Sequence, residues 1–272
     1  MAIVTEDGIV AGLKPPNSFV KSTFTGEAAG QWHNLGVVAG VPSVWTLGAP
    51  GMGGVAVSTT TIGGALPFSN PLLGNAYLAQ LSVAVGANIV ACMIYDLLWY
   101  QSGIAETTTT AQTVNSVTWP ARDRAGSTNG EGVEIWMHCT TATTNASAIA
   151  TTTYSYTNQA GVPGRSAGLA YSWPATAVAG TLVPFALSGS DTGVRSVQSV
   201  TLGTSYAGGQ VELIAIRRVA TIPFVAPLSG LVLDWAALGF PQLFNDSALY
   251  MGVSLSGTAA GNVSGSVAYA HG

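Results

Sequence analysis

The chain has 272 residues, of which eight are Lys or Arg and twelve are Asp or Glu, so that 7% of the residues are charged and the formal net charge is −4. An ordinary soluble domain has roughly 25% charged residues. The shortage of basic side chains excludes a protein that neutralises many nucleic-acid phosphates, and the composition excludes a coiled coil, a charged disordered tail and collagen.

A free domain of this size normally covers its surface with Lys, Glu, Asp and Arg, and this chain has too few of them to do so. Large exposed apolar patches usually mark interaction sites. The charge deficit therefore predicts extensive self-assembly into a homo-oligomer. The alternative is a monomer whose surface consists of neutral residues such as Ser and Thr.

Residues 1–75 are rich in Gly and Pro and have no regular hydrophobic period. Their start carries acidic residues where a secretory signal would be basic, so we expect no such signal. A flexible linker would not carry large aromatic anchors, yet several are present. We expect an extended arm that lies in grooves of its own core or of a neighbouring subunit. The candidate contact residues are Phe19, Phe24, Trp32 and Trp45.

No charge occurs between Ala28 and Tyr95, and residues 77–95 are long enough for a membrane-spanning helix. Leu81, Val83 and Val85, however, alternate with more polar or smaller residues, which is the period of a half-buried strand. No Lys or Arg flanks the stretch to orient a helix. We therefore expect no membrane insertion, and a strand pair or one long bent strand over residues 76–100.

The rest of the chain reads as a series of short strands bounded by Gly, Pro, Asn or Ser. The only helical candidate, Leu231 to Leu238, is short, and the stretch from about residue 254 reads as a strand or trailing arm. This pattern predicts an all-β fold: an antiparallel β-sandwich over residues 76–272, with little helix. The expected strands cover residues 106–110, 114–119, 132–140, 151–157, 182–187, 194–202 and 210–217.

A short echo favours a jelly-roll-like arrangement of these strands. Thr118–Ala121 and Ser172–Ala175 share the letters Trp-Pro-Ala and lie 54 residues apart, and the Tyr- and Gly-containing segments that follow them, from Tyr154 and from Ser205, lie about 50 residues apart. A unit of that size fits a four-stranded half of a jelly roll. Chance recurrence in a chain of low complexity is the other interpretation.

Few residues are candidates for chemistry. Cys92 and Cys139 are the only cysteines, and they are either buried free thiols or one disulfide bridge. His138 beside Cys139 lacks the further ligands of a zinc site. His138 and Glu134 share one strand face, which we interpret as two polar residues on a solvated strand. We find no nucleophile motif, phosphate loop or dinucleotide fingerprint, and expect no catalytic, cofactor or metal site.

Two sugar-related alternatives stay open. Trp119 and Trp136 could form an aromatic glycan-binding face, although such residues are as usual in a core or an interface. Asp123, Glu131 and Glu134 are the acidic cluster that a carbohydrate-active enzyme could use, because glycoside hydrolysis needs two carboxylates across a cleft. A solvated loop and strand is the reading that we favour for these acids.

The whole profile resembles the virion structural proteins of tailed bacteriophages, especially their β-sandwich head decoration, or cement, proteins. It combines the Gly/Pro-rich aromatic arm, many Thr/Ser/Gly strands and hardly any charge. The resemblance is one of style across the whole chain and carries no site residues. The main capsid proteins of such phages have a long charged helix, which this chain lacks.

The resemblance implies a non-enzymatic virion protein that forms a homo-oligomer, with a trimer favoured, and binds other capsid proteins. Residues 1–75 would then lie largely on other chains. The alternatives are a tail or receptor-binding component with a glycan face, a shell-forming capsid protein, and the carbohydrate-active enzyme.

Overall fold

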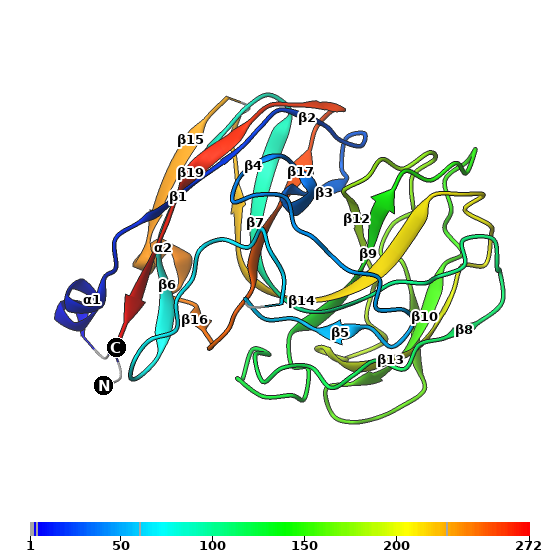
Figure 1. The fold of residues 1–272 in the computed structure, drawn as a ribbon, viewed down its shortest axis with the longest axis horizontal. Helices are drawn as coiled ribbons and strands as arrows, with labels where there is room; N and C mark the ends of the chain where they lie inside the picture. Colours follow the sequence, from blue (N-terminus) through cyan, green and yellow to red (C-terminus); the bar gives the residue numbers. More distant parts are fainter. Residues whose placement is uncertain (1–2, 4, 60, 227) are drawn as a thin grey trace.

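Antiparallel strands make up nearly all of the regular structure of this chain, seen in a computed structural model that describes residues 3, 5–59, 61–226 and 228–272. They form two lobes that share a middle set of strands, β7, β14 and β17, and both chain ends lie at the far end of one lobe (Figure 1). The expected all-β fold of antiparallel sandwich type is confirmed.

The middle of the molecule is a barrel-like ring, because the largest sheet closes on itself through a pairing of β14 with β7. Strand β5 (Val55–Ala56) pairs with Trp99 and Tyr100 of β7, beyond the part of β7 that pairs with β17. A 3-10 turn, Leu35–Val37, follows β3. In order around the ring, the strands are β14 (Gln210–Pro223), β9 (Val133–Thr141), β12 (Thr181–Pro184), β3 (Trp32–Asn34), β17 (Leu249–Leu255) and β7 (Ile89–Gln101).

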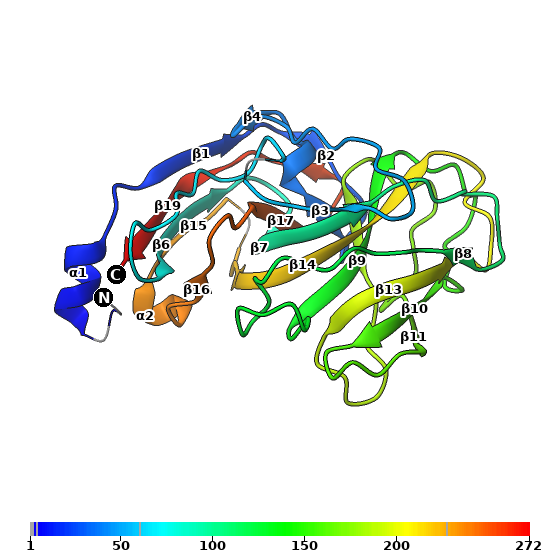
Figure 2. The same ribbon diagram turned by 60° about the horizontal axis from the view of Figure 1, so that its bottom comes forward.

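A second sheet covers β7 and β17 from outside the ring, and a buried aliphatic core fills the space between them. A small pair, β2 (Phe24–Thr25) with β18 (Ala259–Ala260), lies beside it. Figure 2 shows β4 and β1 along one margin of this sheet. In spatial order its strands are β15 (Gly230–Asp234), β6 (Ala76–Val85), β19 (Val263–His271), β1 (Asn17–Lys21) and β4 (Gly40–Val41), with β16 (Gln242–Leu243) also on β6.

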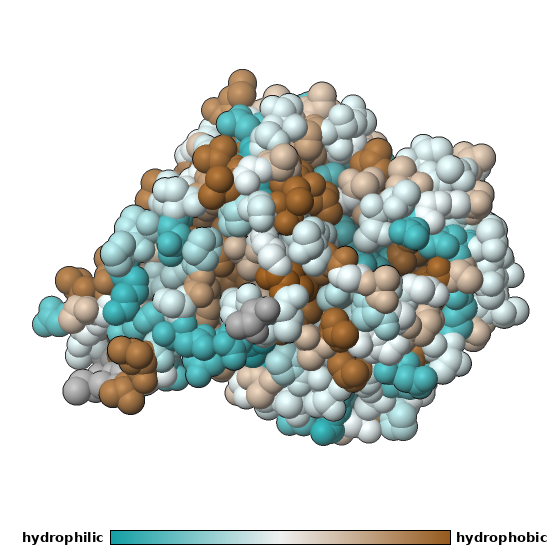
Figure 3. All heavy atoms as spheres, in the orientation of Figure 1, coloured by the Kyte–Doolittle hydropathy of each residue, from teal (hydrophilic) through white to brown (hydrophobic). Residues whose placement is uncertain are grey.

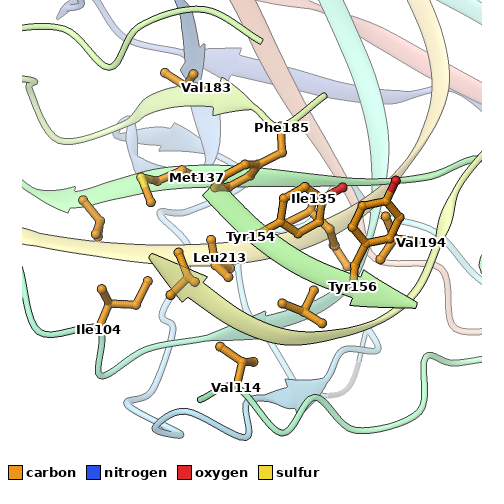
Figure 4. Packing of buried hydrophobic residues seen from close by; sticks show 14 of the residues in the cluster. Ile104, Val114, Ile135, Met137, Tyr154, Tyr156, Val183, Phe185, Val194 and Leu213 are labelled. Carbon is orange, nitrogen blue, oxygen red and sulfur yellow. The ribbon is translucent and has the colours of Figure 1, made fainter. Parts of the chain in front are cut away.

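A third sheet covers the ring strands β9 and β14 in the other lobe, and here the core is rich in aromatic rings. Tyr154 and Tyr156 stack with their centroids 4.7 Å apart, and Phe185 packs against Tyr154 at 4.6 Å (Figure 4). In order, the strands of this sheet are β11 (Arg165–Gly168), β10 (Thr153–Asn158), β13 (Val194–Thr201) and β8 (Gln112–Thr113).

The period of two along β7 explains why one strand can serve two cores. Cys92 and Ile94 point outward into the core under the second sheet, whereas Met93, Tyr95 and Leu97 belong to the cluster inside the ring. Neighbouring side chains of a strand point to opposite faces, so a strand buried on both faces reads as a continuous apolar run. Residues 89–95 of β7, at the end of the charge-free stretch, are such a run.

Helices are few and short. Helix α1 (Glu6–Gly12) begins at the N-cap Thr5, whose hydroxyl accepts from the amide of Gly8 at 3.1 Å. Helix α2 (Trp235–Leu238) begins at Asp234 in the same way and ends at Gly239. The expected helix Leu231–Leu238 is therefore only half right, because its first half is strand β15. No helix in the described ranges is long and apolar enough to span a membrane.

Two other expectations were wrong in detail. Residues 106–110 and 114–119 are turns and irregular chain rather than strands. The side chain of Gln112 supplies the turn bonds, accepting from the amide of Ala105 at 2.8 Å and donating to the carbonyls of Ala105 and Thr108. Residues 76–101 are two strands, but β6 and β7 belong to different sheets and do not pair with each other.

The N-terminal segment packs on the chain's own sheets. Strand β1 lies between β19 and β4, and β3 lies between β12 and β17. The buried ammonium of Lys21 donates to the carbonyls of Val38, Pro42 and Ser43, at 3.2, 2.7 and 3.4 Å. Residues 17–66 thus complete two sheets of this chain, and the further expectation that the segment reaches other subunits stays a prediction.

Candidate functional site

A chain of buried polar side chains lies inside the ring. His138 Nδ1 is 2.8 Å from Glu212 Oε1, and His138 Nε2 is 3.3 Å from Asn34 Nδ2. Tyr95 donates its hydroxyl to Asn34 Oδ1 at 3.0 Å. Because an amide NH₂ can only donate, His138 accepts at Nε2 and donates from Nδ1 to the carboxylate. Four strands, β3, β7, β9 and β14, each contribute one member of this network.

The network holds the ring together but is not set up for catalysis. Both nitrogens of His138 are engaged, and the ring of Trp45 packs edge-on against it at a centroid distance of 4.9 Å. A general base needs a free nitrogen within reach of the proton that it takes. The expected neighbour of His138, Glu134, instead accepts from Trp136 Nε1 and Arg218. The interpretation of His138 as a solvated residue was wrong, since it is fully buried.

A second buried polar cluster lies where the two outer cores meet. Asp96 accepts from Arg122 Nε at 3.1 Å and from Ser247 Oγ at 2.7 Å, and Arg217 Nη2 lies 3.6 Å away. Arg122 also donates to the carbonyls of Val57 and Leu97. The pair of Asp96 and Arg122 is buried with good hydrogen bonds, which is the condition under which a buried ion pair is tolerated. Arg217 is held less completely: Nη1 donates to the carbonyl of Gln242, whereas Nε and Nη2 have no hydrogen-bond partner among the described residues.

A groove of about 620 Å³ opens beside this cluster, between the two lobes. Small residues, amides and the ring of Phe244 form most of its walls, and the guanidinium of Arg122 is already bound to Asp96. Within the described residues, no group of three or more His, Cys, Asp or Glu side chains is arranged to hold a metal ion. Cys92 and Cys139 are both free and buried.

The three acids of the cluster found in the sequence, Asp123, Glu131 and Glu134, make hydrogen bonds and ion pairs within the fold. Asp123 is buried and accepts from the amides of Ala125, Ser127, Gly130 and Glu131 at 2.7–3.0 Å. Burial raises the pKa of its carboxyl, but these bonds outweigh that effect, so its pKa is lowered. A carboxyl with a lowered pKa is a poor general acid.

The other two acids of that cluster stand in ion pairs. Glu131 pairs with Arg124 and accepts from the Thr192 hydroxyl, and Glu134 pairs with Arg218 at 2.9 Å. The structure thus gives each of the three candidate carboxylates its own structural partners.

The two candidate glycan platforms are core residues. Trp119 is 1% exposed and donates from Nε1 to the carbonyl of Val194 at 2.7 Å, and Trp136 is fully buried inside the ring. A sugar-binding platform needs an exposed ring face, so the structure contradicts the alternative of a glycan face at these two residues and agrees with their interpretation as core residues.

The four candidate contact residues of the N-terminal segment differ in exposure. Phe19 is fully buried in the core beneath the second sheet, and Trp45 is buried inside the ring. Phe24 is half-buried and stacks on His33 at 4.4 Å, and Trp32 is half-buried beside Trp136. Phe19 and Trp45 are therefore anchors within this chain rather than exposed contacts.

The folded chain has even fewer surface charges than its composition suggests. Seven of the twenty charged side chains are buried: Lys21, Glu27, Asp96, Arg122, Asp123, Glu212 and Arg217. Six more form the pairs Arg124–Glu131, Arg165–Asp191 and Arg218–Glu134. On the face drawn in Figure 3, hydrophilic residues form one band at the lower left and small separate groups elsewhere, among neutral and apolar residues.

The strand registers define an uncharged surface on the outer face of the second sheet. One row across the sheet pairs Val41 with Val20, then Ser264 with Ala84. The next row pairs Ser18, Ser266, Ser82 and Val232 in the same way. All eight are exposed or half-buried, and we call them the uncharged face. Such a surface suits contact with another protein.

Comparisons with known proteins give only weak likenesses. No protein-family model matches the chain, and no curated protein matches it. Two solved structures match weakly: the VP2 subviral particle of infectious bursal disease virus and a structure of the Gt strain of that virus. Each match has 9% sequence identity and covers 95% of this chain. The match covers 81% of the first structure's chain, with a TM-score of 0.19, and 82% of the second structure's chain, with a TM-score of 0.17. At these TM-scores the likeness supports no argument about this chain.

Proposed function

We propose that this protein is a non-enzymatic structural subunit of a virion, which assembles with copies of itself and with other capsid proteins. The observation that carries the assembly is the uncharged face together with the burial of seven of the twenty charges. A subunit whose surface is largely neutral gains by burying it, because obligate interfaces are more hydrophobic than transient ones. The virion setting rests on the resemblance of the sequence to phage structural proteins.

Within that role, we favour a decoration subunit that assembles as a trimer, as the resemblance implies, over a shell-forming subunit. The sugar-related alternatives lose support, because Trp119 and Trp136 are buried and because Asp123, Glu131 and Glu134 are held by structural bonds. A tail component without a glycan face is the remaining alternative within the same class.

The first experiment measures the mass of the purified full-length chain. Sedimentation velocity and native mass spectrometry between 1 and 50 µM are expected to show a discrete oligomer, and electron microscopy of the same sample separates small oligomers from closed shells. A monomer throughout this range would contradict the proposal.

A matched pair of variants then locates the contact. Val20 on the uncharged face and Val162 in the turn between β10 and β11 are both 49% exposed. Val20→Lys would place an ammonium in the contact, where its desolvation is costly, so we expect the oligomer to weaken at least ten-fold. Val162→Lys adds the same charge elsewhere and is expected to leave the mass unchanged. Equal behaviour of the two variants would rule out the uncharged face as the contact.

A further inference from the structure

The two edges of the second sheet are not equivalent. At one edge, β4 has only two residues and is followed at once by Pro42. Short edge strands and Pro are devices that prevent pairing with other chains. At the other edge, β15 has five residues, Gly-Leu-Val-Leu-Asp, and pairs only with β6 among the described strands. The edge strand β15 lacks those protections.

The open edge is also apolar. Val232 is 62% exposed and Leu231 37% exposed. Asp234 is the only charged residue between Val219 and Asn245. Val219, Leu233 and Leu238 are only partly buried and pack against the rim of the core beneath this sheet. An exposed apolar edge strand offers a template for another strand.

The outer edges of the third sheet differ from β15. Strand β8 has two residues, and β11 begins with Arg165, which is paired with Asp191 at 2.8 Å. Strand β15 therefore combines length, exposure and lack of charge in a way that these edges do not.

The hydrogen-bond pattern shows which backbone groups of β15 are free. The amide of Val85 donates to the carbonyl of Ser229 at 2.9 Å, and these two residues continue the register between β6 and β15. Bonded and non-bonded pairs alternate along antiparallel strands. Leu231 and Leu233 therefore bond to β6, whereas the N–H and C=O groups of Gly230 and Val232 and the N–H of Asp234 point to the open edge. The C=O of Asp234, the N-cap of α2, accepts the first bond of that helix.

We propose that β15 pairs antiparallel with β15 of a second copy, about a two-fold axis at Val232, so that the second sheet continues across two subunits. This inference rests on the proposed self-assembly and names a two-fold contact within it, which by itself joins two copies and is separate from the contacts that would close a trimer. A second copy is the partner that the strand itself fits. In this register Val232 faces Val232, Leu231 faces Leu233, and Asp234 faces Gly230, so no charge meets another charge.

In this register the backbone groups that point to the open edge would form hydrogen bonds between the two copies. Val232 would exchange two hydrogen bonds with its counterpart, and the N–H of Asp234 would donate to the C=O of Gly230 on either side. The two leucine pairs would extend the partly exposed core from one subunit to the other. The two Asp234 carboxylates would lie at opposite ends of the paired strands, where they do not repel each other.

The decisive variant is Val232→Pro, because it removes an N–H that points to the open edge and leaves the bonds to β6 in place. Two lost hydrogen bonds correspond to about ten-fold or more in the dimer dissociation constant. We expect that weakening in sedimentation equilibrium, with an unchanged circular dichroism spectrum. The control is Val232→Thr, which keeps the N–H and the β-branched shape and is expected to dimerise as the native chain does.

Cross-linking tests the same contact in a variant that keeps every backbone N–H group of β15. A bis-maleimide with a two-carbon spacer is expected to join two copies of Val232→Cys, since the paired Cα atoms would lie about 5.5 Å apart. It should not join copies of Val20→Cys, whose sites would lie about 34 Å apart at a strand spacing of about 4.8 Å. The native Cys92 and Cys139 are fully buried and are expected to stay unmodified.

The outcomes separate the two proposals. An oligomer that persists in Val232→Pro, with no cross-link in Val232→Cys, overturns the pairing of β15 and leaves self-assembly standing. A native chain that is monomeric at 50 µM overturns both. If Val232→Pro does not fold, the cross-linking pair decides alone.

Discussion

A buried histidine gives this protein a sensitivity to acid. His33 on β3 is 2% exposed and stacks on Phe24, and within the described structure its Nδ1 has no hydrogen-bond partner. Burial lowers the pKa of His33 to about 3. The folded protein therefore keeps His33 neutral well below the pH at which the unfolded chain protonates it.

The sign of the pH dependence follows from this difference. Between about pH 6.5 and pH 3 the unfolded chain binds a proton at His33 that the folded chain does not, so the free energy of unfolding falls as the pH falls. The contribution is at most about 1.4 kcal/mol per pH unit. Urea unfolding at pH 7, 5 and 4 checks it: the loss should be smaller in His33→Phe. An equal slope in both proteins would show that other groups cause the acid sensitivity.

Asp96 and Glu134 allow a direct comparison of a buried and an exposed ion pair. Asp96 is fully buried between Arg122 and Arg217, whereas Glu134 and Arg218 are both about one-third exposed. Asp96→Asn leaves two buried guanidinium groups without a counter-charge, and we expect a loss of about 3–5 kcal/mol in the free energy of unfolding. Glu134→Gln is expected to cost less than about 1 kcal/mol. Chemical denaturation of both variants at pH 7 measures the difference, and similar losses would contradict the role assigned to Asp96.

At the scale of elements, the N-terminal segment divides into a dispensable and an indispensable part. Helix α1 contacts the end of β19 mainly through Ile9, which belongs to a small satellite cluster. Strand β1 instead fills the position between β19 and β4 and brings Phe19 into the core.

We therefore expect that a chain lacking residues 1–13 still folds, with a melting temperature only a few degrees lower. A chain lacking residues 1–21 exposes the edge of β19 and loses Phe19, and it is expected to aggregate. Phe19→Ala alone should cost about 3–5 kcal/mol. Circular dichroism melting of the three proteins tests this order. A fully stable chain without residues 1–21 would show that β1 is the loose arm expected from the sequence.

The alternation of apolar with other residues predicts most of the strands, but it does not predict which strands pair with each other. The strand over residues 132–140 was predicted closely, because Val133, Ile135 and Met137 alternate with other residues and face one core. The run 106–110 looked equally β-branched, yet the side chain of Gln112 ties it into turns. Most of strand β15 was taken for a helix because its three consecutive apolar residues, Leu231–Leu233, have no clear period.

The buried polar sites could not be predicted, because their members are distant in sequence. His138 meets Glu212 across 74 residues, and Asp96 meets Ser247 across 151. The sequence shows Glu134 on the same face as His138, but the register places Glu212 directly opposite His138. Only the closure of the ring decides which carboxylate the histidine contacts.

At the scale of the whole molecule, seven of the twenty charged side chains are buried in the interior. The clusters around Asp96 and around Glu212 bind the ring strands to each other, and the outer face of the second sheet is left with serine, alanine and valine. A composition with little charge therefore becomes a molecule with polar clusters inside and a largely neutral outer face on the second sheet.

A neutral contact surface predicts how assembly responds to solution conditions. Charge-driven contacts weaken as salt screens them, with a Debye length of about 10 Å at 0.1 M. Contacts made by valine, leucine and backbone groups are not screened, and they weaken on cooling and strengthen with sulfate. We expect the dissociation constant of the oligomer to change less than about three-fold between 50 and 500 mM NaCl, to rise on cooling from 25 to 4 °C, and to fall when sulfate replaces chloride. Sedimentation equilibrium under these conditions measures all three. A ten-fold weakening by NaCl would mean that charged groups such as Lys14 and Arg195, rather than the uncharged face and β15, make the contact.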